Sequence, residues 1–259
     1  MDLQAAADAN MDALRQNPYP GRGIVIGQTP DRRHLVQVYW IMGRSENSRN
    51  RIFVQEGDLV RTAPFDESKV EDPSLIIYNC VRTWAPSAYT PPDDVDEEQV
   101  VPARSHIVTN GDQTDTVYEG LELGRTFEES LYRRTFEPDA PNYTPRIAGL
   151  VEPQNGPHAY QLGILKTLAN NEDYPARQVF NYGSFVGGIG HFIATYDGDG
   201  SPLPSFTGEP RPLPLCDEID ATLDLYWDAL DPDNKVSLLV KFIDPATDEC
   251  EIRIVNKNQ

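Results

Sequence analysis

Eight small polar and acidic residues run without interruption from Thr109 to Thr116, between a segment rich in Ile and Val and an amphipathic segment. Such a string cannot belong to a hydrophobic core. Its Asn110-Gly111-Asp112 sequence favours a turn with positive backbone φ, and the Thr and Asp side chains that follow are good helix N-caps. The sequence therefore predicts a loop between a strand and a helix, and such a loop presents amides, hydroxyls and carboxylates to a polar small molecule.

The length of the chain, 259 residues, is enough to bury a substantial core. Layered folds built on sheets often use about this length as one unit, so we expect a single domain over 1–259. Hydrophobic residues make up 39% of the chain and the mean hydropathy is -0.50, values that fit a globular protein with many polar loops. The longest apolar runs are far shorter than the ~20 residues of a membrane-spanning helix.

The chain is strongly acidic, with 41 Asp and Glu residues, 22 Lys and Arg residues and a formal net charge of -19. Repulsion argues against nucleic acid and anionic membranes as partners. Acidic runs such as 93–98 are expected to be solvated loops. The widely spaced Cys80, Cys216 and Cys250 indicate neither a zinc cluster nor a disulfide framework, so we expect no metal and a reducing compartment. The N-terminus lacks the pattern of a secretory signal, and we expect a cytoplasmic protein.

Hydrophobic periodicity predicts strands, then helices, then further strands, an order typical of an α+β layered fold. A helix is expected over 1–16, ended by Asn17-Pro18-Tyr19-Pro20-Gly21, and a hairpin over 23–27 and 34–42. The other expected helices are 116–124, 126–135 and 217–230. The other expected strands are 51–55, 75–82, 105–109, 159–166, 178–182, 192–196, 236–243 and 250–255. Dense proline over 201–214 predicts an extended segment without regular structure.

A second polar string, from Gly43 to Arg51, places three arginines beside Ser and Asn side chains just after a predicted strand. The guanidinium groups of Arg44, Arg49 and Arg51 stay charged at any working pH and can bind a phosphate bidentately. The competing explanation is a set of surface ion pairs with nearby carboxylates.

The segment Tyr78-Asn79-Cys80 ends a strand that is expected to be buried. The Tyr78 phenol and the Asn79 amide are placed to orient a substrate or to donate a proton, although a strand end packed into the core needs no function. Cys80 has no obvious base beside it, so we interpret it as structural. In the first polar string, Asp112 and Asp115 are candidate proton acceptors, with helix capping as the competing account.

Arg146, in Tyr143-Thr144-Pro145-Arg146, and His191, which follows Gly187-Gly188-Ile189-Gly190, complete the candidates. The glycines permit close backbone approach to a ligand and expose N–H groups as an anion nest. A lone histidine is more often structural than catalytic. The glycine spacing does not match a dinucleotide-binding fingerprint.

Six segments, taken in order, resemble the archaeal-type IMP cyclohydrolase family. They are Tyr19 to Gly23, Gly43 to Arg51, Tyr78 to Arg82, Thr109 to Thr116, Asn142 to Ala148 and Gly190 to Tyr196. The likeness covers most of the chain, from Pro18 to Pro214, and is most specific where ordered polar strings occur. Relative to that family the chain is longer, with an N-terminal helical extension over 1–17, an acidic insertion near 91–98 and a C-terminal extension over 215–259.

The resemblance implies the four-layer α-β-β-α sandwich of N-terminal-nucleophile hydrolases. It implies no autoprocessing, because no processed Ser, Thr or Cys opens this chain. It also implies ring closure of 5-formamidoimidazole-4-carboxamide ribonucleotide to inosine monophosphate (IMP) with loss of water, in purine biosynthesis. The alternatives are a non-catalytic purine-nucleotide-binding protein and an amidohydrolase on the same sandwich. An exposed sheet edge or helix layer leaves room for a homo-oligomer.

Ring closure depends on holding two ends of one molecule in a reactive pose and needs no metal or organic cofactor. We therefore predict that Arg44, Arg49 and Arg51 bind the phosphate and the developing oxyanion, with help from Arg22 or Arg146. Tyr78 and Asn79 are predicted to orient the base and relay a proton, with a carboxylate or a water accepting the amide proton. The remaining predicted residues of the pocket are Asn110, Asp112, Thr114, Asp115 and His191.

Overall fold

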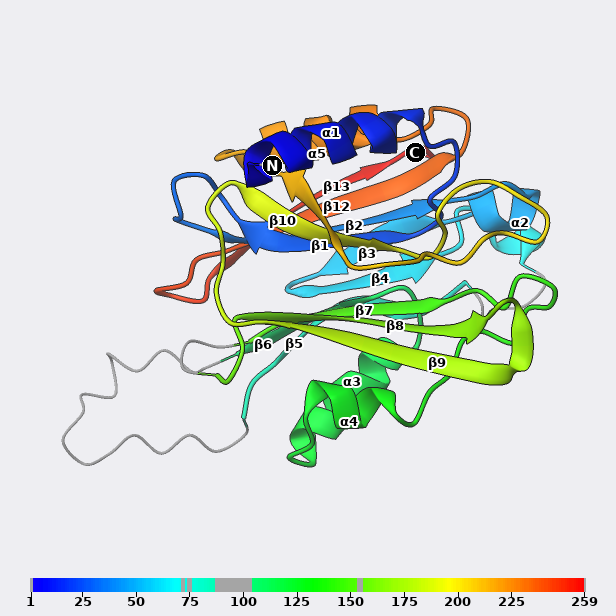
Figure 1. The fold of residues 1–259 in the computed structure, drawn as a ribbon, viewed down its shortest axis with the longest axis horizontal. Coiled ribbons are helices and arrows are strands. Elements are labelled where there is room, and N and C mark those ends of the chain that lie inside the picture. The colour runs from blue at the N-terminus through cyan, green and yellow to red at the C-terminus, as the bar shows by residue number, and fades with distance from the viewer. Residues whose placement is uncertain (1, 71–72, 74–75, 87–103, 153–155, 259) are drawn as a thin grey trace.

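The computed structural model describes residues 2–70, 73, 76–86, 104–152 and 156–258. The acidic run 93–98, within the predicted insertion, lies outside these residues. The described chain is α+β, with two antiparallel sheets stacked face to face (Figure 1).

The first sheet has the strand order β11-β10-β1-β2-β12-β13. Its central strand β2 is buried along its whole length, because helices cover one face and the second sheet covers the other. The predicted β1–β2 hairpin is confirmed, with Gly23 paired to Trp40. The bounds are β1 (Gly23–Gln28), β2 (Leu35–Met42), β10 (Ile189–Ala194), β11 (Arg211–Pro214), β12 (Lys235–Ile243) and β13 (Cys250–Asn256).

The second sheet has the order β3-β4-β5-β6-β7-β8-β9. Strands β6 and β8 confirm their predictions closely. The bounds are β3 (Ile52–Glu56), β4 (Leu59–Ala63), β5 (Asn79–Trp84), β6 (Ser105–Thr109), β7 (Arg146–Val151), β8 (Tyr160–Leu168) and β9 (Asn171–Tyr182).

Several strands differ from the sequence prediction. β7 was not predicted as a strand, and β5 and β10 are shifted from the predicted ranges 75–82 and 192–196. β11 lies in the proline-rich segment that we expected to be irregular; it is a sheet-edge strand, where prolines lacking an N–H are tolerated. β9 begins well before residue 178, because its first half is exposed and carries no apolar alternation. β4 is a short strand paired with β3 that the sequence prediction did not include.

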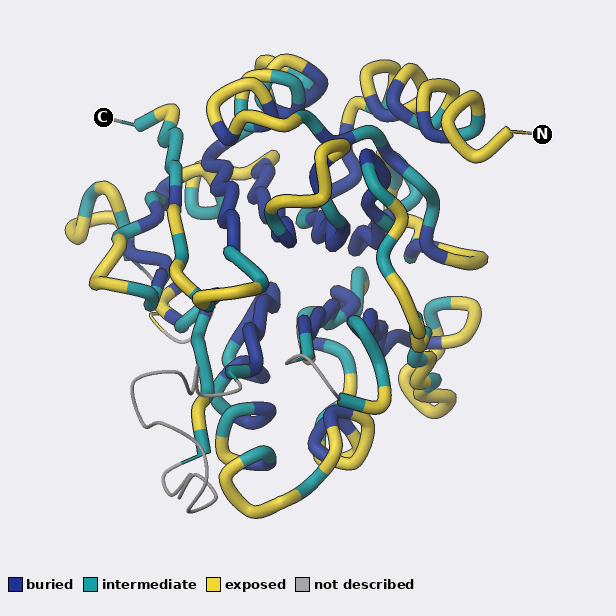
Figure 2. Tube along the Cα trace, turned by 90° about the vertical axis from the view of Figure 1, so that its left-hand side faces the viewer, coloured by how far each residue is buried: buried dark blue, intermediate teal, exposed yellow. Residues whose placement is uncertain are grey.

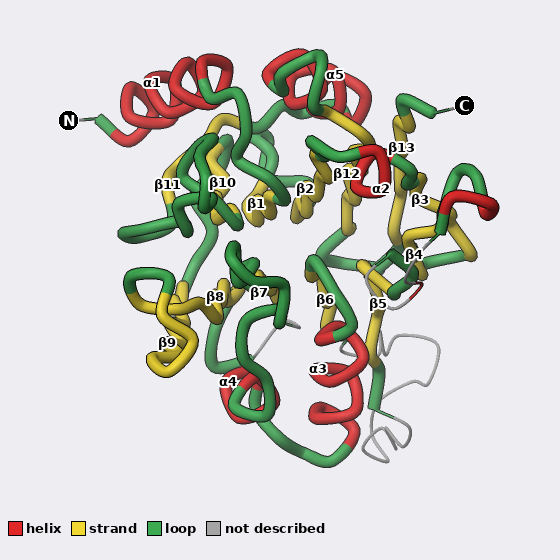
Figure 3. Tube along the Cα trace, turned by 90° about the vertical axis from the view of Figure 1, so that its right-hand side faces the viewer, coloured by secondary structure: helices red, strands yellow, loops and turns green. Residues whose placement is uncertain are grey.

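Two pairs of helices lie on the outer faces of the sheets (Figures 1 and 3). α1 (Leu3–Gln16) and α5 (Ile219–Ala229) contact the first sheet, while α3 (Gln113–Glu122) and α4 (Phe127–Leu131) lie against the second. The α1 prediction is confirmed, and α3 begins three residues before its predicted start. The short helices α2 (Glu46–Arg49) and η1 (Glu67–Lys69) lie in connections.

The main core lies between the sheets, and buried residues concentrate along their strands (Figure 2). Gly149 on β7 shows how closely the sheets approach, since a Cβ there would lie 2.6 Å from the side chain of Ile26 on β1. A smaller core beneath α3 and α4 includes Ile107, Phe127 and Leu165. The sheet separation is therefore fixed by small and apolar side chains on both faces.

The segment 215–259 supplies α5, β12 and β13, and β12 is hydrogen-bonded to β2 along its length. Asn256, in β13, accepts a hydrogen bond from the Phe53 backbone N–H at 2.8 Å and donates one to its carbonyl at 3.2 Å. These bonds join the edges of the two sheets. Among the residues that the structure describes, none of the helices combines the length and the apolar character needed to cross a bilayer.

The excess of carboxylates predicts that salt stabilises this fold, because charge repulsion in the compact state is screened. Raising KCl from about 0.1 M to about 1 M shortens the screening length from ~10 to ~3 Å. We expect the thermal midpoint to rise by several degrees, measured by circular dichroism. The gain must level off above 1 M, because screening saturates; an unchanged or lower midpoint would contradict this account.

Candidate active site

A cavity of about 280 Å³ lies where four distant segments of the chain meet. The segments are residues 19–22, 44–51, 137–144 and 196–203. The residues that line the cavity are Tyr19, Arg22, Arg44, Ser45, Asn47, Ser48, Arg51, Glu137, Asp139, Asn142, Thr144, Tyr196 and Leu203. Only a folded chain brings these groups together.

Arg22 enters the cavity because the backbone before β1 passes very close to β10. The Arg22 N–H donates to Thr195 Oγ1 at 3.1 Å, and the Thr195 N–H donates to the Arg22 carbonyl at 2.9 Å. Gly21 has a φ of +73°, and a Cβ there would lie 2.2 Å from Thr195 Oγ1. The position therefore requires glycine on both conformational and steric grounds.

Arg51 is placed by the one-turn helix α2, whose N-cap Ser45 and residue Ser48 form a capping box. The Asn50 side chain then donates to the Asp66 carbonyl at 2.8 Å and accepts from the Asp66 N–H at 2.7 Å. These two hydrogen bonds to the chain beyond β4 hold Asn50 in place, and with it Arg51, the residue just before β3. Arg51 is consequently 5% exposed.

Arg22 and Arg51 carry their charge without a carboxylate partner. Their Nε atoms are buried and have no hydrogen-bond partner, and neither side chain forms an ion pair within the described part of the chain. Burial, together with the neighbouring Arg22, lowers the pKa of Arg51. Glu137 attracts both guanidinium groups but forms no ion pair with either, so two buried cations share one carboxyl group. Burying charge that is only partly compensated is costly, so the cavity is suited to an anionic or strongly electron-rich group.

Two acidic residues that the sequence analysis did not single out, Glu137 and Asp139, line this cavity, and Glu137 is the buried one. It is 7% exposed, and burial raises the pKa of its carboxyl group although Arg22, Arg146 and Arg51 oppose the shift. Its flanking residues give no motif, and only the fold shows its position. A carboxyl group with a raised pKa in a cavity is a candidate for general acid–base chemistry.

Tyr78 lies beside the two arginines, and its hydroxyl is 3.0 Å from that of Tyr39. Burial raises the pKa of Tyr78, while Arg51 and Arg22 act in the opposite direction. On the cavity wall, the Tyr19 and Tyr196 rings stack with centroids 6.1 Å apart. The cavity thus combines cationic groups, a phenol and an aromatic surface.

Arg44 is more exposed than the other two cavity arginines. It forms an ion pair with Asp199, donates to the Gly200 carbonyl at 3.0 Å and lies 5.0 Å above the Tyr19 ring. Opposite it, the Thr144 hydroxyl is 2.6 Å from that of Tyr196 and also bonds Asp139. The rim of the cavity is therefore basic on one side and hydroxyl-rich and acidic on the other.

Of the predicted residues, Arg22, Arg44 and Arg51 line the cavity. Tyr78 lies beside Arg22 and Arg51 without lining it, and the other predicted residues lie away from the lining. Arg49 donates to the Gly43 carbonyl at 2.9 Å and to Asn234 at 3.1 Å. His191 is bonded to the Tyr160 hydroxyl at 2.6 Å, and burial lowers its pKa to about 4.

The polar string is used mainly for internal bonds. Asp112 forms ion pairs with Arg146 at 2.6 Å and Arg134 at 2.8 Å. The remaining partners are Asn110 with the Pro145 and Ile147 backbone, Thr114 with Thr109, and Asp115 with Asn79 and Arg82. These carboxylates neutralise nearby arginines. Helix capping was the competing account for this string, but the N-cap of α3 is Asp112, whose side chain makes no capping hydrogen bond.

Two further observations bear on chemistry. Cys80 is fully buried, its thiol donates to the Val60 carbonyl at 3.3 Å and burial raises its pKa, which fits the structural role expected for it. Within the described ranges, no group of three or more His, Cys, Asp or Glu side chains is arranged to hold a metal ion.

Fold and cavity together define an α+β protein with a cationic cavity for a small polar molecule. Residues 19–249 match the model of the IMP cyclohydrolase-like protein family, and the chain belongs to this family. It is 33% identical over 152 residues to the IMP cyclohydrolase of Methanocella arvoryzae, covering 57% of this chain and 62% of that protein. It is 34% identical over 137 residues to that of Natronomonas pharaonis, covering 51% and 58%. The matches thus span about three fifths of each relative.

The unpaired charge of Arg51 predicts that Arg51→Met stabilises the protein. Removing a buried cation without a partner is expected to raise the free energy of unfolding by about 1–2 kcal/mol, measured by urea denaturation. Inorganic phosphate should stabilise the wild type more than the variant, because Arg51 adds to the positive charge of the cavity.

Arg146→Met is the matched control, because it removes a cation bonded to Asp112 and Gln113. We expect it to destabilise the protein by about 1–3 kcal/mol. A loss of stability in Arg51→Met equal to that of the control would show that Arg51 is satisfied in the free protein.

Proposed function

We propose that this chain is an IMP cyclohydrolase, which closes 5-formamidoimidazole-4-carboxamide ribonucleotide to IMP with loss of water. The observation that carries the proposal is one cavity holding two arginines without carboxylate partners beside a carboxyl group with a raised pKa. The relatives named above carry the name IMP cyclohydrolase, which supports the same reaction.

In the proposed reaction, the carboxamide nitrogen attacks the formyl carbon and the formyl oxygen takes up negative charge. Arg22 and Arg51 are suited to stabilise that oxygen, because their guanidinium groups are preorganised away from bulk water. Glu137 in its ionised form accepts the proton from the carboxamide nitrogen. It then returns the proton to the oxygen, which gives a hydroxyl group on the new ring carbon. A second proton, from the former formamido nitrogen, is transferred to this hydroxyl, which leaves as water as the ring C=N bond forms. Tyr78 is assigned the role of positioning the base beside the two arginines.

The 5′-phosphate is assigned to the basic rim. Arg44, Ser45 and Ser48 line the cavity there, and a guanidinium with neighbouring hydroxyls is a common phosphate environment. This assignment places the ribose between the rim and the two inner arginines. Holding both ends of the molecule supplies much of the expected rate enhancement.

We further propose the four-layer α-β-β-α sandwich of N-terminal-nucleophile hydrolases, without autoprocessing, as one domain over 1–259. The positions of the helix pairs outside the two sheets support this arrangement. A purine nucleotide as the ligand, a cytoplasmic location and the capacity to form a homo-oligomer stay predictions. A nucleotide-binding protein without turnover is the alternative that the assay below separates.

The wild type is expected to convert the formamido ribonucleotide to IMP. The change in absorbance on ring closure measures the rate. Because Glu137 must be ionised and its pKa is raised above 4.5, activity should fall as the pH drops through that higher value. Glu137→Gln is expected to lose at least about a hundredfold in kcat and to lose this acid limb.

Glu128→Gln is the matched control, since Glu128 is an acidic residue of α4 bonded to Tyr132 at the surface. It should retain the wild-type rate and pH profile. A wild type that binds IMP without turnover would leave only the nucleotide-binding alternative, whereas unchanged activity in Glu137→Gln would refute the assigned base.

A further inference from the structure

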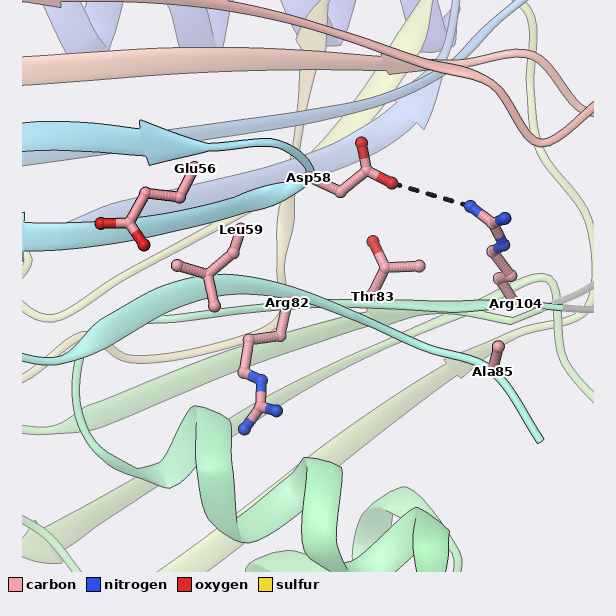
Figure 4. A pocket seen from close by; sticks show the side chains of 7 residues that line it. All are labelled: Glu56, Asp58, Leu59, Arg82, Thr83, Ala85 and Arg104. Carbon is pink, nitrogen blue, oxygen red and sulfur yellow. Dashed lines mark ion pairs between the residues drawn. The ribbon is translucent and has the colours of Figure 1, made fainter. Parts of the chain in front are cut away.

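A second cavity, of about 390 Å³, lies at the other end of β3, beyond the turn that leads into β4. It shares none of the residues that line the first cavity. Its lining residues are Glu56, Asp58, Leu59, Arg82, Thr83, Ala85 and Arg104 (Figure 4). Thr83 lies between Asp58 and Arg104 in this view, while Arg82 points towards α3 and its partner Asp115.

Behind Thr83 lies a cluster of titratable groups that the proposed ring closure does not use. Lys241 on β12 is fully buried, donates to Thr83 Oγ1 at 3.0 Å and is also hydrogen-bonded to Cys250. The Cys250 sulfur is 3.9 Å from His106 Nδ1, and His106 Nε2 is 2.8 Å from Asp248 Oδ1. Contacts between side chains therefore connect an ammonium, a thiol, an imidazole and a carboxylate, in that order.

The hydrogen-bond pattern gives each group a distinct role. The bond to Asp248 assigns the His106 proton to Nε2, which leaves Nδ1 as an acceptor facing the Thr83 hydroxyl at 3.4 Å and the Cys250 sulfur at 3.9 Å. The thiol also lies 3.6 Å from the Asp248 carbonyl, so its proton has two acceptors within reach. Lys241 lies where it stabilises a negative sulfur. A nucleophile, a base within reach and a third group that orients the base form the arrangement found in activated cysteines.

The surroundings also set the protonation states. Burial lowers the pKa of His106, so its ring is neutral at pH 7, although Asp248 and Asp58 oppose the shift and Lys241 adds to it. Burial raises the pKa of Cys250, with Lys241 opposing and Asp58 and Asp248 adding to the rise. Arg104, 3.4 Å from Asp248 and 3.7 Å from Asp58, is the remaining charge. The sulfur is thus mainly a thiol, and its reaction depends on proton removal by His106.

We propose that Cys250 is a nucleophilic thiol that exchanges with small disulfides, with His106 as its base and Asp248 as the positioning residue. The thiol proton moves to His106 Nδ1 as the Cys250 sulfur attacks one sulfur of the disulfide. The disulfide bond breaks, and the departing thiolate takes the proton from His106. One mixed disulfide and one free thiol result, so the oxidant is the disulfide itself.

Cys216 provides an internal control in the same molecule. It is also half-buried and free, but the groups that act on it are the Thr222 hydroxyl and the Asp217 carboxylate, and no imidazole or ammonium of the described residues contacts its sulfur. Burial raises its pKa as it does for Cys250. Cys80 is fully buried and reports unfolding. Comparing the three thiols therefore distinguishes a cysteine that is activated by its neighbours from one that reacts only because solvent reaches it.

The test uses 5,5′-dithiobis(2-nitrobenzoate) as the disulfide probe on the full chain, with each labelled cysteine identified by mass spectrometry over time. At pH 7 we expect Cys250 to react at least about tenfold faster than Cys216. The Cys216 rate should rise about tenfold per pH unit between pH 6.5 and 8.5, because only its thiolate reacts. The Cys250 rate should rise less steeply, because His106 removes the proton during attack.

Asp248→Asn tests the positioning role, and His106→Asn tests the base. Asp248 has a φ of +60°, a conformation that Asn tolerates well, so this variant preserves the turn. Both variants should slow Cys250 by at least about fivefold and leave Cys216 unchanged. Labelling of Cys80 in His106→Asn would show that this variant is unfolded. In that case the Asp248→Asn rates and the wild-type pH slopes decide whether His106 acts as the base. Equal rates at Cys250 and Cys216, or an unchanged Cys250 rate in Asp248→Asn, would overturn the proposal.

Discussion

Two guanidinium groups held beside each other without a carboxylate partner set the main constraint on this molecule. Arg22 and Arg51 repel one another, and the surrounding structure must hold them in place without an ion pair. Hydrogen bonds of the neighbouring backbone hold the two side chains in place. Arg22 is fixed by the reciprocal bonds between its segment and Thr195, and Arg51 by the bonds between Asn50 and Asp66. The sheets keep water out of the region behind them, so the cationic character of the cavity is conserved until a ligand arrives.

Several carboxylates of the chain pair with arginines other than Arg22 and Arg51. Asp112 and Asp115 neutralise arginines on the outer side of the second sheet, and Asp199 holds Arg44 at the rim. Glu137 alone among these carboxylates lies with the inner arginines, and its raised pKa shows that burial outweighs their attraction. An acidic protein thus keeps a small basic region at this cavity, while its carboxylates pair with several of its other arginines.

Much of the architecture follows from local patterns in the sequence. β2 is apolar except for Gln37, and the strand, helix and strand order indicated an α+β fold. The first half of β9 was missed because it is exposed and has no apolar alternation. β11 was hidden because proline obscures a strand at a sheet edge.

The candidate site was only partly predictable. The string from Gly43 to Arg51 identified the right arginines as a group, but α2 decides that Arg44 and Arg51 line the cavity while Arg49 bonds Asn234. The functional interpretation of the Thr109 to Thr116 string overlooked Arg134 and Arg146, which only the fold brings to it. Glu137 has no local signal, because its significance comes from segments more than eighty residues away. Local chemistry suggests candidates, and tertiary pairing selects among them.

The position of β12 has a consequence for how the protein is made. β2 emerges early during synthesis, yet one of its two neighbours in the sheet, β12, follows it by nearly two hundred residues. Until that partner leaves the ribosome, one edge of a largely apolar strand stays open to other chains. The nascent polypeptide therefore passes through a long interval in which chaperones have most to protect, and rapid completion of translation favours the native pairing.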